Sequence, residues 1–353
     1  MSEAPVVWPS AARESAFEHW FAALQAPQQL KRNTLRAASS DASFRRYLRV
    51  DAAQGTRIIM DAPPDKENCQ PFVQVAQLMK SAGLNVPEIL AWDETQGFML
   101  LTDLGAKTMM QLMDREQPQA NQARYLQAVD ALIAWQLASR PDVLPPYDAA
   151  LLQRELSLFP DWYLTQHRGV TLSTEQGRTL DEAFTCIIEQ NLRWPSVYVH
   201  RDFMPRNLMV PDDAGANGLG VLDFQDAVYG PITYDIASLM RDAFLTWEED
   251  FVLDITIRYW QKARAAGLPV GDDFGEFYRG VEWMGLQRHL KVAGIFARLT
   301  LRDGKPQYLA DTPRFIQYIL ATTSRYRELK PLQRLIESIE GTPSISGFAY
   351  GRM

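Results

Sequence analysis

The sequence predicts an α+β protein with two lobes, a small β-rich N-terminal lobe and a large, mainly helical C-terminal lobe. The chain has 353 residues, more than one hydrophobic core usually covers. Short segments rich in β-branched and aromatic residues dominate up to about residue 104, and helical periodicity dominates after it. We therefore expect one lobe over residues 1–104 and another over residues 105–353.

The composition is that of a globular protein, with 46% hydrophobic and 22% charged residues. The formal charge of -7 and the pI near 5.3 argue against a general nucleic-acid or membrane-surface binder. Uninterrupted apolar runs stay well below the ~18 residues of a spanning helix, and the start lacks the basic flank and apolar run of a secretory segment. Cys69 and Cys186 are too far apart to suggest a disulfide framework or a zinc site. We expect a cytoplasmic monomer with no nucleic-acid or membrane partner.

The N-terminal lobe is expected to hold a mostly antiparallel sheet with one helix. The predicted strands cover residues 44–50, 56–63, 87–93 and 97–105. The turn residues 94–97 join the last two strands into a hairpin. The helix is expected at 70–82 and ends at Gly83, and its buried face comprises Phe72, Val75, Leu78 and Met79.

The C-terminal lobe shows repeated helical periodicity. The predicted helices cover residues 119–139, 148–168, 174–192, 232–265, 275–302 and 312–329. Residues of the first helix form one apolar stripe, which comprises Tyr125, Val129, Leu132, Ile133 and Gln136. Ser173 and Gln176 have the spacing of a capping box and predict where the helix at 174–192 begins.

One short β element interrupts the helices, and polar residues follow its strands. Strands at 198–200, 208–210 and 221–224 deliver Asp202, Asn207 and Asp223 to neighbouring loop ends. Phosphoryl transfer needs such oxygen ligands, because one carboxylate orients the attacking hydroxyl while an amide and a second carboxylate hold Mg²⁺ on the nucleotide phosphates. The spacing His-x-Asp-x-x-x-x-Asn, followed later by Asp-Phe, matches the kinase signature.

Longer segments point to a family. HRDFMPRN (200–207), LDFQD (222–226) and AVYGPITYDIASLM (227–240) resemble the aminoglycoside phosphotransferase and choline kinase branch of the protein-kinase-like fold. Within that branch, the chain resembles the anomeric N-acetylmuramate/N-acetylglucosamine kinases of bacterial cell-wall recycling in five further segments: IIMDAPPDKENCQPF (58–72), LNVPEILAWD (84–93), GFMLLTDLG (97–105), ELSLFPDWYL (155–164) and GLQRHLKVAGIFARL (285–299). The match runs from about residue 35 to 330.

The resemblance implies a bilobal kinase-like fold, ATP and Mg²⁺ as cofactors, and phosphorylation of an amino sugar at its anomeric hydroxyl. Asp202 is expected to be the catalytic base, and Asn207 and Asp223 the metal ligands. His200 is expected to be structural, hydrogen-bonding the loop that carries Asp223, because kinase chemistry has no role for an imidazole there. Asp235 is either a helix cap or, by resemblance, a brace for the catalytic loop.

The nucleotide site is expected to use backbone and small polar residues. The segment from Thr102 to Leu104 resembles the linker whose backbone C=O and N–H groups pair with the adenine edge. The stretch 37–50 has no glycine, so it is no G-x-G-x-x-G loop; Ser39, Ser40 and Ser43 either let N–H groups and hydroxyls approach the phosphates or form a plain turn.

The lysine that kinases place on the third strand is missing, since TRIIMDAPP has Met60 and Asp61 there. Either another cation replaces it, or the phosphates rely on Mg²⁺ and backbone. The candidate cations are Arg45, Arg46, Arg49 and Lys66.

The acceptor site is predicted from resemblance and from charge. Arg288, Lys291, Arg298 and Arg302 lie near one stripe of the helix at 275–302, with His289 adjacent. This stripe is either a solvated face or a binding surface for an anionic or amide-bearing substrate such as N-acetylmuramate, whose lactyl carboxylate suits arginine.

Further acceptor candidates are aromatic or acidic. Trp162, Tyr163 and Trp283 offer flat faces on which sugars pack, although core packing is the alternative. Glu155 and Asp161 are candidates for contacts to sugar hydroxyls. Two rival functions stay open, a kinase of another small alcohol and an inactive nucleotide-binding regulator.

Overall fold

The computed structural model describes residues 6–40, 44–211 and 218–341. The chain divides into two compact units: Met1–Leu112 with Arg206–Asp226, and Met113–Pro205 with Ala227–Met353. The fold is α+β, with a small antiparallel sheet near the N-terminus and a mostly helical remainder. The segment Arg206–Asp226 packs with the first unit although it follows more than ninety residues of the second. The expected boundary after residue 104 stays a prediction.

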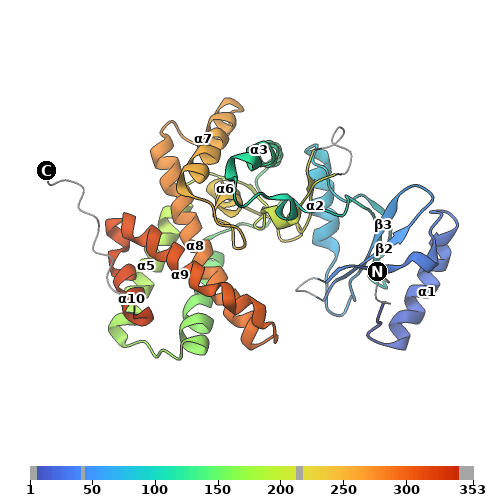
Figure 1. Cartoon of the computed structure of the whole chain (residues 1–353), viewed down its shortest axis with the longest axis horizontal. Helices are drawn as coiled ribbons and strands as arrows, with labels where there is room; N and C mark the ends of the chain where they lie inside the picture. Colours follow the sequence, from blue (N-terminus) through green and yellow to red (C-terminus); the bar gives the residue numbers. More distant parts are fainter. Residues whose placement is uncertain (1–5, 41–43, 212–217, 342–353) are drawn as a thin grey trace. The chain divides into compact units, whose positions relative to one another are not determined.

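A five-stranded antiparallel sheet forms the centre of the first unit, in the order β1-β2-β3-β5-β4. The strands are β1 (Arg36–Ser40), β2 (Arg46–Asp51), β3 (Thr56–Asp61), β4 (Ile89–Asp93) and β5 (Phe98–Thr102). The hairpin predicted from the turn at 94–97 is present as the β4–β5 pair. Figure 1 shows the strands between helices α1 (Ala11–Gln25) and α2 (Gln70–Ser81).

Helix α1 corrects the expectation of one helix in this part of the chain. Its Phe17, Trp20 and Phe21 are buried against Leu48, Val50, Ile59, Phe98 and Leu100 of the sheet. The signal was in the sequence, because these aromatic residues are three and four positions apart behind the N-cap Ser10.

Helix α2 has the predicted bounds and most of the predicted face. Phe72, Val75 and Met79 are buried, Leu78 is half-buried, and Gly83 follows the helix with a φ of 80°. A left-handed glycine just beyond a helix is a common way to end it.

The second unit is built around α8 (Phe274–Leu301), which packs against the π-helix Phe159–His167, α6 (Thr233–Met240) and α9 (Thr312–Arg325). The other helices are α3 (Gln122–Leu137), α4 (Ala149–Leu156), α5 (Thr174–Leu192), α7 (Glu249–Ala265) and α10 (Lys330–Glu340). The predicted stripe of α3 is buried, and the capping box of Ser173 and Gln176 is present.

Three predicted helices are divided in the structure, although the range 148–168 is helical nearly throughout. The predicted helix 232–265 is split into α6 and α7, since the Asp242 carboxylate accepts from the Phe244 N–H and so competes with helical hydrogen bonding. The predicted helix 148–168 is α4 followed by the π-helix, with Pro160 in its first turn. The predicted helix 312–329 ends at Arg325, and α10, which was not predicted, follows.

The β element that carries the motif consists of two separate pairs. Strand β6 (Ser196–Val199) pairs with β9 (Val228–Pro231), a strand that was not predicted. Strand β7 (Leu208–Met209) pairs with β8 (Gly220–Val221). The first pair belongs to the second unit and the second pair to the first unit.

Candidate functional site

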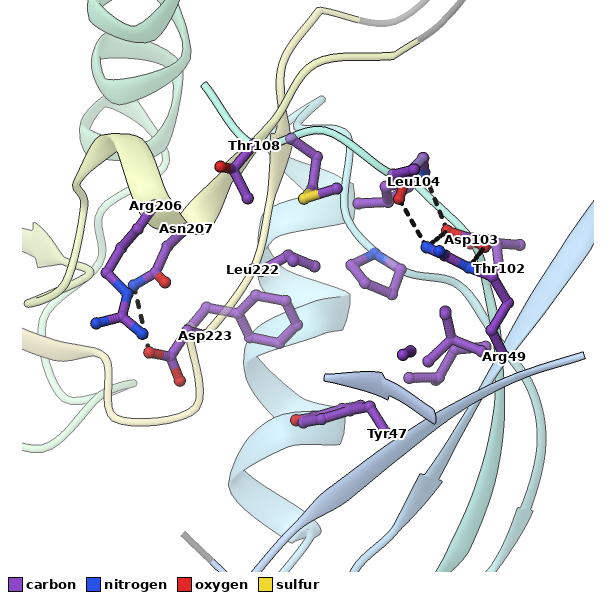
Figure 2. A pocket seen from close by; sticks show the side chains of 18 of the residues that line it. Tyr47, Arg49, Thr102, Asp103, Leu104, Thr108, Arg206, Asn207, Leu222 and Asp223 are labelled. Carbon is purple, nitrogen blue, oxygen red and sulfur yellow. Dashed lines mark hydrogen bonds and ion pairs between the residues drawn. The ribbon is translucent and has the colours of Figure 1, made fainter. Parts of the chain in front are cut away.

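The first unit contains a cavity of about 370 Å³, within the ~300–1,000 Å³ range of small-molecule sites. Its wall comes from the sheet, α2, the segment after β5 and the β7–β8 pair (Figure 2). Of the predicted site residues, five line it: Arg49, Thr102, Leu104, Asn207 and Asp223. The other lining residues include Tyr47, Asp103, Thr108, Gln111 and Arg206.

Asn207 and Asp223 meet at one side of this cavity (Figure 2). The backbone N–H of Leu222 donates to the carbonyl of Asn207 over 2.9 Å, so β7 and β8 bring the two side chains together. The Asn207 Nδ2 lies 3.3 Å from Asp223 Oδ2. Asp223 has a φ of 63°, a left-handed conformation that is uncommon for non-glycine residues and is typical of functional sites.

These two side chains fit a magnesium ion better than an all-protein metal cage. Among the described residues, no group of three or more His, Cys, Asp or Glu side chains is arranged to hold a metal. Mg²⁺ usually takes one or two protein oxygens and completes its shell with water and substrate phosphates. A carboxylate beside an amide at the edge of a nucleotide-sized cavity meets that requirement.

The segment after β5 lies along the cavity and is tied to β2. Arg49 Nε donates to Asp103 Oδ2 over 2.6 Å, and Arg49 Nη2 donates to the Gly105 carbonyl over 2.9 Å. Thr56 Oγ1 lies 2.6 Å from the same carboxylate of Asp103. Thr102 and Leu104 are thereby held at the cavity wall, where the expected pairing of their backbone with adenine stays a prediction.

Strand β3 has Met60 and Asp61 where kinases usually have the third-strand lysine. Its residues alternate between the two faces of the sheet. Ile58 lines the cavity, and Met60, two residues on, shares its face. Asp61 points to the α1 face, where it is fully buried and pairs with Arg13 and Arg46. The described part of β3 therefore offers no cation to the cavity.

Of the four candidate replacement cations, Arg49 lines the cavity. Arg46 is engaged by Asp61, Arg45 pairs with Glu67 over 3.1 Å, and the Lys66 ammonium lies 5.0 Å from the centre of the Phe44 ring. Strand alternation explains the difference, because Arg46 and Arg49 are an odd number of residues apart and face opposite sides of the sheet.

The predicted phosphate cradle is only partly described. Ser39 and Ser40 end strand β1, beside the cavity-lining Ala38. Ser43 lies outside the described residues. The three serines stay predicted contacts to phosphate.

Asp202 belongs to the second unit and follows β6 in a tightly held loop. The backbone N–H groups of His200 and Arg201 donate to the buried Asp235 carboxylate over 2.7 and 3.0 Å. The N–H of Asp202 donates to His200 Nδ1 over 3.2 Å. Arg201 has a φ of 76°, so the residue before Asp202 is held in a left-handed conformation.

The side chain of Arg201 ends in a buried ionic cluster around Glu155. Glu155, which is 5% exposed, binds Arg201 closely and accepts from Lys291 Nζ at 3.0 Å, from Gln287 at 3.1 Å and from the Tyr147 hydroxyl. Burial by itself raises the pKa of Glu155, but the nearby cations and hydrogen bonds lower it to about 2.

Arg288 approaches the same loop from α8. Its Nη1 donates to the Arg201 carbonyl over 2.6 Å. Arg288 and Lys291 are buried, so the alternative of a solvated face is wrong for them, whereas Arg302 is exposed. The contacts of Glu155, Arg288 and Lys291 favour a role in positioning the Asp202 loop over direct contact with a substrate.

The remaining acceptor candidates are dispersed. Asp161 is exposed and Trp162 is half-buried. Trp283 is 1% exposed and packs beside Tyr326 in the core. His289 is buried and lines a second, smaller cavity within the second unit.

Comparison with known proteins defines the family. The family model described as "Phosphotransferase enzyme family" matches residues 34–272, which is more than half of the chain. The chain belongs to this phosphotransferase family. It is therefore an enzyme that transfers a phosphoryl group.

Two relatives of this phosphotransferase are named N-acetylmuramate/N-acetylglucosamine kinase. The protein from Neisseria meningitidis serogroup B is 48% identical over 316 residues, covering 89% of this chain and 93% of the relative. The protein from Pseudomonas aeruginosa is also 48% identical, over 302 residues that cover 86% of this chain and 87% of the relative.

Solved structures confirm the kinase-like fold of the phosphotransferase. A choline/ethanolamine kinase family protein from Mesorhizobium loti matches with a TM-score of 0.61 at 15% identity, over 91% of this chain and 99% of that one. An ADP-bound aminoglycoside phosphotransferase matches with a TM-score of 0.57 at 12% identity, over 86% of this chain and 97% of that one. In the described part of the phosphotransferase, the helices are too short or too polar to cross a membrane.

Several lining residues of the phosphotransferase were not predicted from its sequence. Tyr47, Asp103 and Arg206 line the first cavity. Arg206 lies inside the quoted motif and Asp103 inside the expected linker, so their places in the sequence were a usable signal. Tyr47 carried no such signal, because only the pairing of β2 with its neighbours shows which face it occupies.

Proposed function

We propose that this phosphotransferase moves the γ-phosphoryl group of ATP to the anomeric hydroxyl of an N-acetylated amino sugar, N-acetylmuramate or N-acetylglucosamine. The observation that carries the proposal is the 48% identity, over 86–89% of the chain, to relatives that are named for these two sugars. The products are the sugar 1-phosphate and ADP, which suits a role in peptidoglycan recycling.

The first cavity is the proposed site for ATP. Its volume fits a nucleotide, and the backbone from Thr102 to Leu104 lies along its wall. Arg49 is the proposed substitute for the third-strand lysine, because it is the candidate cation that lines this cavity. The pairing of Arg49 with Asp103 keeps the guanidinium in a fixed place before the nucleotide arrives.

Asn207 and Asp223 are the residues that would hold Mg²⁺. The bound ion would offset the negative charge of the phosphates. The Asn207 amide also contacts the Asp223 carboxylate, so each side chain fixes the orientation of the other. Asp226 is exposed and directly follows the Gln225 whose side-chain amide donates to Asp223, so we assign it no metal contact.

Asp202 is the proposed base. Its carboxylate accepts a hydrogen bond from the anomeric hydroxyl, aims the oxygen at the γ-phosphorus and takes the proton as the new P–O bond forms and the bond to ADP breaks. The hydrogen bonds of its loop to Asp235 and His200 hold the carboxylate in place, so little entropy is lost when the sugar binds.

A substrate panel tests the proposed function. ADP release is measured with N-acetylmuramate, N-acetylglucosamine, glucose, choline and kanamycin at equal concentrations. We expect the two N-acetylated sugars to give kcat/KM values at least ~100-fold above those of the others, since a site built to bond a substrate group discriminates strongly against molecules that lack it. Faster turnover of choline or kanamycin would contradict the proposal, as would ATP binding with no turnover of any acceptor.

A further inference from the structure

Tyr47 brings a hydroxyl group into the first cavity from strand β2. Tyr47 and Arg49 line the cavity, whereas Leu48 and Val50, on the other face of the strand, belong to the core under α1. Figure 2 shows the hydroxyl end of Tyr47 pointing away from Arg49 and toward the side of the cavity that holds Asp223. The hydroxyl is therefore directed to the side of the proposed metal ligands.

The strand register places Tyr47 beside the position of the missing lysine. Tyr47 lies directly opposite Met60 on β3, and its partner on β1 is Ser39. Of the two residues at the lysine position, Met60 is the one on the cavity face, because Asp61 points to the α1 face. Directly opposite residues of an antiparallel pair have Cβ atoms ~5 Å apart on the same face. The Tyr47 side chain therefore begins one strand away from the place where kinases have their phosphate-binding lysine.

Tyr47 is also farther than Arg49 from the expected adenine-binding segment. Arg49 Nε donates to Asp103 Oδ2 over 2.6 Å, and its Nη2 donates to the Gly105 carbonyl over 2.9 Å, so Arg49 is tied to that segment. Tyr47 lies two residues away along β2, and two residues of a strand span ~7 Å. In ATP the β- and γ-phosphates are the groups farthest from the adenine. Arg49 is therefore placed nearer the α-phosphate, and Tyr47 nearer the β- and γ-phosphates.

Arg45 contacts the phenol oxygen of Tyr47 and strengthens its O–H group as a donor. Arg45 precedes Tyr47 by two residues, which puts both side chains on the same face. Burial by itself lowers the pKa of Arg45, but interactions with Tyr47 and Glu67, which include a hydrogen bond to Tyr47, raise it overall. Arginine can only donate, so this bond uses a lone pair of Tyr47 and not its proton. A hydroxyl that accepts from a cation is polarised and becomes a stronger donor.

Glu67 fixes the position of Arg45. Arg45 Nη2 lies 3.1 Å from Glu67 Oε2, and the two side chains are only 9% and 13% exposed. The other carboxylate oxygen, Oε1, accepts from the backbone N–H of Phe44 over 3.2 Å. Glu67 is itself held by a turn, since its N–H donates to the Pro63 carbonyl over 2.9 Å. A carboxylate just before α2 thus holds the cation that contacts Tyr47.

We infer that Tyr47 is a further nucleotide-binding residue, whose hydroxyl donates a hydrogen bond to the β- or γ-phosphate of ATP, and that Arg45 is its positioning residue. The phenol keeps its proton and contributes direction without adding charge, which suits a place where Mg²⁺ offsets the charge of the phosphates. The inference rests on the proposed function and deepens it, because it names the donor that stands beside the position of the missing lysine.

Calorimetric titration with ATP and with AMP, at one fixed concentration of Mg²⁺, tests the contact. Tyr47→Phe removes the hydroxyl and keeps the ring. We expect the ratio of the Kd for ATP to the Kd for AMP to rise ~10-fold or more over wild type, the typical cost of a lost hydrogen bond to a charged group. Tyr308→Phe is the matched control, since Tyr308 is half-buried and does not line the cavity, and it should leave the ratio unchanged. Unfolded protein binds neither nucleotide, so partial unfolding does not alter the ratio.

A double-mutant cycle tests the role of Arg45. Arg45→Met should weaken ATP binding ~3-fold or more when Tyr47 is present and have almost no further effect in Tyr47→Phe, because residues that act as one unit are not additive. Equal effects in both backgrounds would overturn the positioning role of Arg45.

The same titrations separate this inference from the proposed function. An unchanged ratio of the two Kd values in Tyr47→Phe, with normal binding of ATP by the wild type, would overturn the phosphate contact and leave the proposed function in place. A wild-type enzyme that binds no ATP would instead overturn the proposed nucleotide site and this inference together.

Discussion

Asp202 is the residue on which the proposed chemistry depends most. Without its carboxylate the anomeric hydroxyl has no acceptor for its proton, so Asp202→Ala should lower kcat at least ~100-fold, the usual contribution of a positioned base. The affinity for ATP should stay close to that of the wild type, because Asp202 is not among the residues that line the first cavity. Steady-state kinetics with nucleotide titration measures both quantities. Asp181→Ala, an exposed carboxylate on α5, is the control, and near-normal turnover in Asp202→Ala would reject the assignment.

Substitution of Asp223 should affect nucleotide binding, whereas substitution of Asp202 should affect turnover. Asp223→Ala should weaken the binding of ATP in the presence of Mg²⁺ at least ~10-fold and make binding nearly independent of Mg²⁺, because the main oxygen ligand of the ion is lost. Asp223→Asn keeps the shape and tolerates the left-handed backbone, so it separates the loss of charge from a change in the loop. Calorimetric titration of ATP with and without Mg²⁺ measures both the affinity and its dependence on the ion. An unchanged Mg²⁺ dependence in Asp223→Ala would contradict the metal assignment.

Glu155 gives the molecule a measurable pH dependence. Its pKa falls from 4.5 in the unfolded chain to about 2 in the folded state, so it binds a proton more readily when unfolded. The stabilisation is therefore complete above pH 4.5 and is lost as the pH falls toward 2. By linkage, the difference in free energy of unfolding between wild type and Glu155→Gln should shrink by about 2 kcal/mol between roughly pH 6 and pH 3.

Urea unfolding at each pH measures this difference. Glu182→Gln, whose carboxylate is 73% exposed, is the control and should show almost no such change. A difference between wild type and Glu155→Gln that does not vary with pH would show that the ionic cluster around Arg201 is not formed in solution.

At the scale of elements, we propose that β2 supplies, through Arg49, the phosphate-binding cation that β3 supplies in other kinases. Arg49→Met should raise the KM for ATP ~10-fold or more, the typical cost of a hydrogen bond to a charged group, and leave the KM for the sugar nearly unchanged. Arg57→Met on β3 is the control, because Arg57 does not line the cavity. Equal effects of the two substitutions would reject the role of Arg49.

The sequence predicted the elements whose periodicity is local. Strands β2 to β5, helix α2 and the stripe of α3 follow from alternation or from the helical repeat, and α1 carried the same kind of signal, which was missed. The break between α6 and α7 could not be predicted in this way. It depends on the turn that Asp242 stabilises, and no glycine or proline marks the place.

For the site, too, the sequence predicted what depends on local spacing and did not predict what depends on tertiary contacts. The motif pointed to Asn207 and Asp223, which both line the first cavity, because the kinase signature is a spacing along the chain. The choice among Arg45, Arg46 and Arg49 depends on which face of the sheet each occupies and on which carboxylate it meets. Glu155 and Arg288 are held by segments more than 40 residues away, so their contacts with the Arg201 loop follow only from the tertiary fold.

At the scale of the whole molecule, the proposed work is divided between two compact units. The first holds the proposed nucleotide cavity with Asn207 and Asp223, and the second holds Asp202 with its supporting cluster. Only four residues of chain separate Asp202 from Asn207. The motif at 200–207 therefore contains both the proposed base, Asp202, and one of the proposed metal ligands, Asn207.

The position of the transferred phosphate tests this account most directly. Wild-type enzyme is incubated with ATP, Mg²⁺ and N-acetylglucosamine, and the product is analysed by ³¹P and ¹H NMR. The account predicts a single phosphate ester on the anomeric oxygen, with the phosphorus coupled to the anomeric proton. A phosphate on any other hydroxyl, or release of inorganic phosphate without a sugar phosphate, would contradict it.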